Sequence, residues 1–214
     1  FNIARSNEQG LIDDIDTEFL HHYRVAIRKV RSILSLLKGV FPERTTEHLK
    51  KEFAYFAQKT NRLRDLDVYL LTRDQYEMLL PEALRPGVAE MFDEFATERG
   101  DELDKIRRHL RTKTYAKRIA AIEDFLCGAD ALDASLNSHV PIKSFVAKRI
   151  TKIYKKIRVI SSGLDDDTPD ANIHALRIQC KKMRYMLEFF ACLFDAGGIT
   201  KLTKRLKRLQ DKLG

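Results

Sequence analysis

Two stretches of the sequence set a histidine ahead of a row of arginines and lysines, and the spacing is the same in both. The members are His21, Arg24, Arg28, Lys29 and Arg31 in the first row, and His174, Arg177, Lys181, Lys182 and Arg184 in the second. No acidic residue interrupts either row. A guanidinium bonds two phosphate oxygens at once, an ammonium acts as a point charge, and a protonated imidazole donates as well. The chemistry that these rows favour is therefore the binding of a chain of phosphates.

In an α-helix, the histidine and the residues 3, 7 and 10 positions later lie at about 0°, 300°, 340° and 280° around the axis. They form one stripe about 80° wide, beside the apolar face that Ile27, Val30 and Leu34 define. Lys29 lies off this stripe. Like charges at these spacings destabilise a helix by roughly 0.2–0.5 kcal/mol per pair, and a bound anion would offset that cost. The plainer alternative is a solvated basic surface.

The two rows belong to an internal repeat. A shift of 153 residues places the first row on the second without a gap, and it also pairs apolar residues, such as Leu34 with Leu187 and Phe41 with Phe194. The shift continues into the segment that follows, where Lys51 pairs with Lys204. We interpret the chain as two similar helical halves related by a pseudo-twofold axis.

The composition is typical of long helices. Of 214 residues, 44% are hydrophobic and 33% charged, with only 9 Gly and 5 Pro. We therefore predict an all-α protein, one domain over residues 1–214 made of two halves at approximately 1–128 and 129–214. The net charge of +8 is sorted along the sequence, because 143–158 contains no acid whereas 74–104 is strongly acidic. This sorting favours a binding surface for an anion over a uniformly basic surface.

Helical periodicity and breaker residues set the expected elements. Gly39 and Gly128 are expected to end helices, and Thr168 to cap one that starts at Pro169. The expected helices span 16–38, 45–71, 87–111, 113–127, 141–160, 169–195 and 199–214.

A second polar stretch, at 61–68, ends the second expected helix. It is either a helical patch of ion pairs, or a brace in which Asp65 or Asp67 holds an arginine of the row while Arg64 points at the ligand. The repeat places its counterpart just past Gly214, so we expect the second half to be truncated in the middle of this motif.

Metal and catalytic sites are not favoured. No Asp, Glu or Cys stands at ligand spacing near His21, His22 or His174, and these histidines have only cations as flanks. The three cysteines show no metal or disulfide spacing, which indicates a reduced, cytoplasmic protein. No apolar run approaches 18 residues, and no signal peptide is visible. We expect no catalytic residue, no metal and no cofactor.

At these residues the sequence resembles the conserved histidine α-helical domain, the CHAD family. The two rows, read as His21-x-x-Arg24-x-x-x-Arg28-Lys29-x-Arg31 and His174-x-x-Arg177-x-x-x-Lys181-Lys182-x-Arg184, look like its two signature stretches. The segments 64–68 and 209–214 look like its two other recurring patches. The resemblance covers nearly the whole chain in order.

The resemblance implies two four-helix bundles with pseudo-symmetry around a central basic pore. It also implies binding of inorganic polyphosphate without catalysis, association with polyphosphate granules in prokaryotes, and an N-terminal triphosphate-tunnel domain in the full-length chain, which would suit a sequence that starts at Phe1. Lysine stands at 29, 181 and 182 where the family often has arginine, so fewer bidentate contacts are expected. The implied anion-binding residues are His21, Arg24, Arg28, Lys29, Arg31, Lys51, Arg64, Lys152, Lys156, His174, Arg177, Lys181, Lys182, Arg184 and Lys204.

Three other functions remain as alternatives. A nucleic-acid-binding helical module would use the same cations, but no aromatic row for base stacking is interleaved with them. A polyphosphatase would need a metal cluster or an activated nucleophile, which the sequence does not show. The basic amphipathic segment 199–213 resembles a membrane-surface helix, although packing within the second half explains its leucines equally well.

Overall fold

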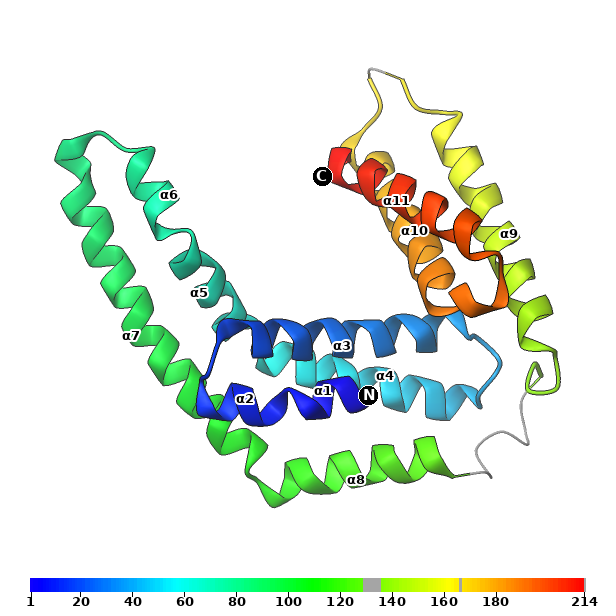
Figure 1. Cartoon of the computed structure of the whole chain (residues 1–214), viewed down its shortest axis with the longest axis horizontal. Helices are drawn as coiled ribbons and strands as arrows, with labels where there is room; N and C mark the ends of the chain where they lie inside the picture. The colour runs from blue at the N-terminus through cyan, green and yellow to red at the C-terminus, as the bar shows by residue number, and fades with distance from the viewer. Residues whose placement is uncertain (129–135, 166, 214) are drawn as a thin grey trace. The chain divides into compact units, whose positions relative to one another are not determined.

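All regular elements that the chain forms in its described residues are helices. The structure is a computed structural model that describes residues 1–128, 136–165 and 167–213 (Figure 1). No strand occurs in these ranges, so the predicted all-α class is confirmed.

The chain folds into two compact units. The first comprises Phe1–Arg31 and Glu47–Ala129, and the second comprises Ser32–Thr46 and Asp130–Gly214. The units therefore differ from the expected halves by the stretch 32–46. The reason is packing, because Leu36 and Leu37 are buried in one apolar cluster with residues of the second unit.

The first unit is built from short and long helices that share a buried apolar cluster. Its helices are α1 (Asn2–Ser6), α2 (Glu8–Asp13), the start of α3 (Thr17–Leu36), α4 (Glu43–Lys59), α5 (Asn61–Leu71), α6 (Arg73–Met78), η1 (Glu82–Leu84), α7 (Arg85–Leu110) and α8 (Lys113–Cys127). α5 lies along α7, and one buried cluster joins Leu20 of α3, Leu63 of α5 and Leu103 of α7 (Figure 1). The sequence did not predict α1, α2 or α6, because each is too short for apolar periodicity to show.

The second unit is built on α10. Its helices are α9 (Ile142–Ser161), α10 (Asp170–Phe189), η3 (Ala191–Leu193) and α11 (Ala196–Lys212). α10 packs against both α9 and α11, over a core that includes Val146 and Met186. Thr168 does not cap α10 as expected, since its hydroxyl bonds the backbone N–H and the carboxylate of Asp165.

The helix boundaries repeat at the shift found in the sequence. A shift of 153 residues carries Thr17–Leu36 onto Asp170–Phe189 and Glu43–Lys59 onto Ala196–Lys212. The helices of each pair have 20 and 17 residues in both copies. The internal repeat therefore corresponds to two pairs of helices. Their helix lengths are the same in both copies, and so is the number of residues that connect the two helices.

The expected single helix over 45–71 is wrong, because the chain breaks at Thr60. Thr60 leaves the helical region with φ −107° and ψ 5°. Its hydroxyl bonds the carbonyl oxygens of Phe56 and Ala57 at 3.3 and 3.1 Å, which are acceptors that a continuous helix would use. The break separates α4 from α5 and lets the two helices take different directions.

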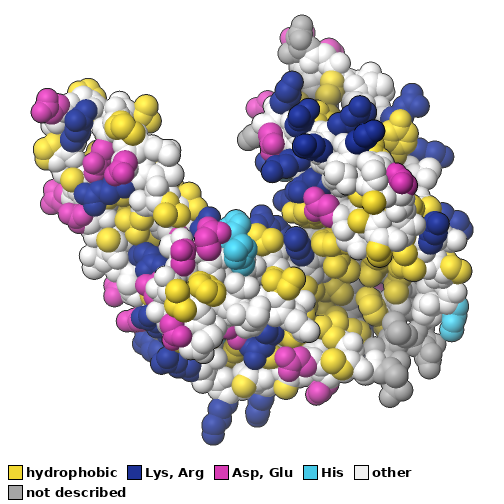
Figure 2. Space-filling model, in the orientation of Figure 1, with side chains coloured by type: hydrophobic (Ala, Val, Ile, Leu, Met, Phe, Trp, Pro, Cys, Tyr) yellow, Lys and Arg dark blue, Asp and Glu magenta, His cyan; other side chains and the backbone are white. Residues whose placement is uncertain are grey.

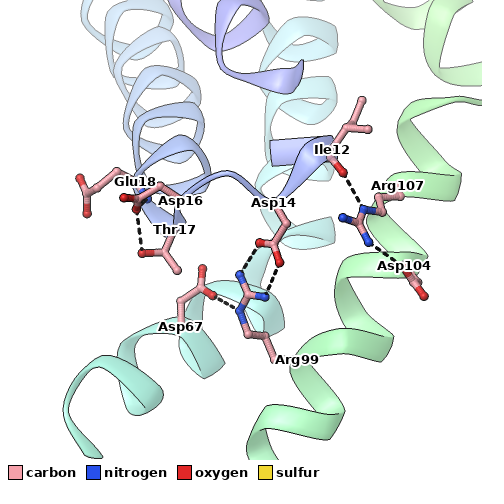
Figure 3. Close-up of polar contacts among 9 residues, drawn as sticks. All are labelled: Ile12, Asp14, Asp16, Thr17, Glu18, Asp67, Arg99, Asp104 and Arg107. Carbon is pink, nitrogen blue, oxygen red and sulfur yellow. Dashed lines mark hydrogen bonds and ion pairs between the residues drawn. The ribbon is translucent and has the colours of Figure 1, made fainter. Parts of the chain in front are cut away.

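An ion triad around the buried carboxylate of Asp67 fixes α5 against α7. Arg99 of α7 donates through Nε to Asp67 of α5 at 2.7 Å, and its two Nη atoms donate to Asp14 at 2.9 and 2.6 Å (Figure 3). Asp67 is only 1% exposed. Burial raises the pKa of Asp67, which the bonds and charge of Arg99 oppose, whereas the bonds to Arg99 lower the pKa of Asp14. Arg99 therefore counteracts the effect of burial on Asp67 and favours its ionised form.

Replacing Arg99 with Met is expected to destabilise the protein by about 3–5 kcal/mol near pH 8, because it leaves a buried carboxylate without its partner. The deficit should shrink toward pH 5. Asp67, whose pKa rises further without Arg99, is then protonated and no longer needs a cation. Urea unfolding at the two pH values measures this.

Arg62→Met is the matched control, since Arg62 pairs with Glu98 of the same helix pair at the surface. It should change the free energy of unfolding little. An Arg99→Met variant that is as stable as this control at pH 8 would contradict the triad's role.

Candidate functional site

The first row lies on the N-terminal two thirds of α3, at the edge of its buried face. Asp16 caps this helix by accepting from the backbone N–H of Glu18 at 2.8 Å (Figure 3). Tyr23 and Ile27 are 2% and 1% exposed and face the core, which leaves His21 and Arg24 half-buried beside them. The stripe expected from helical geometry is therefore present on this helix.

Arg24 ties the row to the helix break. Its Nη1 donates to the carbonyl oxygen of Ala57 at 2.9 Å and to the hydroxyl of Thr60 at 2.8 Å. These acceptors lie in the last turn of α4 and at the start of α5, where a helix end has unpaired carbonyls. Arg24 is thus partly a structural residue, which the sequence did not predict.

Arg64 lies near the start of α5, just after the break at Thr60 that Arg24 contacts. Its Nη1 is buried and has no hydrogen-bond partner within the described part of the chain. A buried donor of this kind costs about 1–3 kcal/mol, and more when it is charged. The expectation that Arg64 belongs to the same site as the first row is consistent with this position.

The electrostatics of His21 and Arg24 show that these cations share one cluster. Burial lowers the pKa of His21, and the charge of Arg64 lowers it further, with smaller effects of His22 and Arg28 and an opposing one of Glu18. Burial also lowers the pKa of Arg24, while Asp65 opposes this and Arg28 and Arg64 add to it. We call His21, Arg24, Arg28 and Arg64 the α3–α5 cluster. The charges of Arg28 and Arg64 both disfavour the charged forms of His21 and Arg24, so an anion is the favourable addition.

The predicted binding residues of the first unit other than His21, Arg24 and Arg64 are exposed. Arg28, Lys29 and Arg31 follow along α3, and Lys51 lies on α4. Exposed cations near a half-buried cluster extend its positive potential toward the solvent.

The second row lies on α10 in the second unit. His174 and Lys182 are exposed, whereas Arg177 and Lys181 are half-buried. The Nε of Arg177 is buried and lacks a hydrogen-bond partner within the described residues. The second copy also lacks the hydroxyl that accepts from Nη1 of Arg24 in the first, because Leu213 stands in place of Thr60.

Arg184, the last member of the second row, is held by its neighbours. Its Nη1 donates to Glu188 at 2.9 Å, its Nε donates to the side-chain oxygen of Gln210 at 3.2 Å, and it stacks on the ring of Tyr185 at 5.1 Å. Glu188 and Gln210 orient this guanidinium. Tyr185 is buried and packs against Phe189.

Asp67 has a different role from the one considered in the sequence. It does not hold an arginine of the row, because its partner is Arg99 of α7. Asp65 is the acid that acts on Arg24, by charge alone. No local signal in the sequence pointed to Arg99, since it lies 32 residues from Asp67 and 85 from Asp14.

The predicted lysines outside the rows lie on exposed faces. Lys152 and Lys156 are exposed on α9, which buries Val146 and Ile153, and Lys204 is exposed on α11. Lys and Arg side chains gather over the second unit, whereas Asp and Glu gather over α6 and the adjoining part of α7 (Figure 2). The basic and acidic segments of the sequence therefore form separate surface regions, the basic one on the second unit and the acidic one on α6 and α7 of the first.

The described residues contain neither a cluster of metal-ligating side chains nor a helix that could span a membrane. No group of three or more His, Cys, Asp or Glu side chains is placed to hold a metal ion there. No helix in these residues is both long enough and apolar enough to cross a bilayer.

Comparison with known proteins identifies the family. The sequence matches the CHAD domain over residues 1–214. No curated protein matches it. The fold is similar to the crystal structure of the CHAD domain from the plant Ricinus communis, with a TM-score of 0.77 and 24% identity over 99% of this chain and 68% of that chain. The chain is an all-helical CHAD domain and belongs to that family.

The α3–α5 cluster predicts a shifted titration of His21. In the intact protein its pKa should lie below 6.5, and Arg64→Gln should raise it toward that value because one repelling cation is removed. NMR titration of the His21 ring measures this. Arg62→Gln, two residues earlier on α5, is the control and should leave the pKa unchanged. Equal His21 pKa values in the wild type and the Arg64→Gln variant would refute the cluster.

Proposed function

We propose that this chain binds inorganic polyphosphate, without catalysis, through the two rows on α3 and α10. The observation that supports it best is a pair of buried guanidinium donors that find no partner among the residues the structure describes: Arg64 Nη1 beside the first row and Arg177 Nε within the second. Buried donors are normally paired, so each of them favours an acceptor from a ligand. Phosphate oxygens are the acceptors that suit guanidinium groups best.

The polymeric nature of the ligand follows from the length of the rows. His21 and Arg31 are ten residues apart on one helix, which is about 15 Å at 1.5 Å per residue. A single phosphate contacts only part of such a row, whereas a chain of phosphates contacts all of it. Membership of the CHAD family, which is linked to polyphosphate binding in general, supports the same ligand.

We further propose that the two rows face a common basic pore between two pseudo-symmetric bundles. The equal helix bounds of α3 with α10 and of α4 with α11 support this, because identical hairpins present their rows in identical ways. In a cell this activity would place the protein on polyphosphate granules, and a triphosphate-tunnel domain on the same chain is a compatible partner.

Changing Arg28 and Lys181 together to Glu is expected to weaken the binding of long-chain polyphosphate by at least about 100-fold. The change places a like charge opposite phosphate in both rows while both residues stay at the surface of their helices. Isothermal titration calorimetry at two salt concentrations measures this, and the wild-type affinity should fall steeply with salt as counterions are released.

Lys113→Glu combined with Lys117→Glu is the matched control, because it changes net charge equally on exposed positions of α8. Undiminished binding in the row variant, with circular dichroism showing intact helices, would exclude the rows as the site. Tighter binding of an oligonucleotide than of polyphosphate would favour the nucleic-acid alternative, and phosphate release with added Mg²⁺ would show an enzyme.

The dependence of affinity on the length of the polyphosphate tests the proposal of a shared pore. If both rows face one pore, a polyphosphate long enough to reach both should bind far more tightly than a short one, because the second contact becomes intramolecular. Lys181→Glu with Lys182→Glu should remove this length dependence and retain the weak affinity for short chains. An equal length dependence in this variant and the wild type would contradict the pore and leave binding to separate rows.

A further inference from the structure

The corner between α7 and α8, in the first unit, bears a histidine that belongs to neither row. His109 lies in the last turn of α7, and the hydroxyl of Thr112 donates to its carbonyl oxygen at 2.7 Å. The same hydroxyl accepts from the backbone N–H of Tyr115 at 3.1 Å and so caps α8. These two bonds fix the backbone of the corner and thereby place the imidazole of His109 against the neighbouring helices.

The ring of His109 contacts aromatic side chains of two helices. Its centroid lies 5.6 Å from that of Tyr55 on α4 and 5.5 Å from that of Tyr115 on α8. Tyr115 in turn packs edge-on against Phe56 of α4 at 5.5 Å, and both of these rings are almost fully buried. His109 is therefore part of the contact that joins α8 to α4.

Two cations share this contact. Lys59 Nζ lies 5.4 Å from the centre of the Tyr55 ring, and the guanidinium carbon of Arg118 lies 4.6 Å from the same centre. Arg118 also donates to both carboxylate oxygens of Glu52, at 2.8 and 2.6 Å. The carboxylate of Glu52 is thus already paired, and the charges that act on His109 are those of the two cations.

This environment accepts the neutral form of His109 far better than the protonated form. Nε2 is buried and has no hydrogen-bond partner among the described residues. The neutral ring can carry its proton on Nδ1, whereas the protonated ring has a donor at both nitrogens. Protonation would therefore create a buried N–H group without an acceptor and add a third positive charge beside Lys59 and Arg118.

Other groups near His109 do not reverse this preference. The carbonyls at the end of α7 favour a positive charge. Burial and the charges of Lys59 and Arg118 outweigh them, and they lower the pKa of His109. On the far side of Tyr115, the carboxylate of Glu8 accepts from the tyrosine hydroxyl and from Arg5.

We propose that His109 is a pH-sensitive switch, whose protonation releases α8 from α4. The neutral ring packs against Tyr55 and Tyr115, whereas the protonated ring needs water at Nε2 and distance from the two cations. Movement of α8 away from α4 supplies both and uncovers Phe56. The switch acts on the first unit alone and does not depend on the binding of polyphosphate.

The direction of the pH dependence follows from the lowered pKa. Because the pKa of His109 in the closed form lies below its ordinary value of 6.5, the contact is stable at neutral pH and weakens as the pH falls below 6.5. At pH 5.5 the equilibrium between closed and open forms shifts by at most about tenfold, since the open form takes up a single proton.

Hydrogen exchange of the full chain, followed by mass spectrometry, measures the release. Protection factors of the α8 amides, corrected for the intrinsic exchange rate at each pH, should fall about three- to tenfold between pH 7.5 and 5.5. Those of α5 should change less. His109→Phe keeps a ring at this position but cannot take up a proton, so it should remove the fall. His48→Phe, at an exposed histidine of α4, is the matched control and should retain it.

Lys59→Met tests the same switch while the histidine remains. Removing one cation should raise the pKa of His109 toward 6.5, which NMR titration of the ring measures, and should reduce the fall in α8 protection. An equal fall in the wild type and His109→Phe, or an undiminished fall in Lys59→Met, would overturn the proposal. So would a fall in α5 as large as that in α8, because it would indicate unfolding of the whole unit instead of release of α8.

Discussion

Repulsion among half-buried cations is the constraint on which the arrangement of the first unit depends. Burial lowers the pKa of both His21 and Arg24, and the nearby charge of Arg64 lowers each of them further. Such a group of charges stays together only because neighbouring parts of the fold hold it. Arg24 is fixed by Ala57 and Thr60, and α5, which bears Arg64, is fixed by the Asp14–Arg99–Asp67 triad. The polar scaffold thus stabilises a charge arrangement that is unfavourable by itself.

The helix break at Thr60 connects this scaffold to the site. A continuous helix through 45–71 would leave no free carbonyl at Ala57 and no hydroxyl bent toward α3. Because Thr60 uses its hydroxyl on the preceding turn, α4 ends there, and Arg24 bonds both the exposed carbonyl and the hydroxyl. One residue of the binding row therefore stabilises the junction that positions Arg64.

Long-period features could be predicted from the sequence, and features set by tertiary contacts could not. The all-α class, α8 at Lys113–Cys127 and the repeat that joins α3 to α10 follow from apolar periodicity and breakers over many residues. The break at Thr60 is marked by no Gly or Pro, and the contact that Arg24 makes with it comes from 36 residues away, so local periodicity favoured a continuous helix. Arg184 was assigned to the row by spacing alone, whereas its orientation is set by Gln210, 26 residues later. Spacing identifies which side chains share a face, but not which of them already have partners.

The differences between the two copies show how one hairpin serves two purposes. α4 contains four cations and three acids and closes its apolar face within its own unit, through aromatic rings and the Glu52–Arg118 pair. α11 contains six cations and one acid, Leu206 and Leu209 stand in place of Phe53 and Phe56, and Arg208 stands in place of Tyr55. Arg205 likewise replaces Glu52, so the second copy lacks the carboxylate that pairs with Arg118 in the first. The repeat therefore preserves the lengths of the two helices, whereas the contacts that bury the second helix in the first copy are exchanged for positive charge in the second.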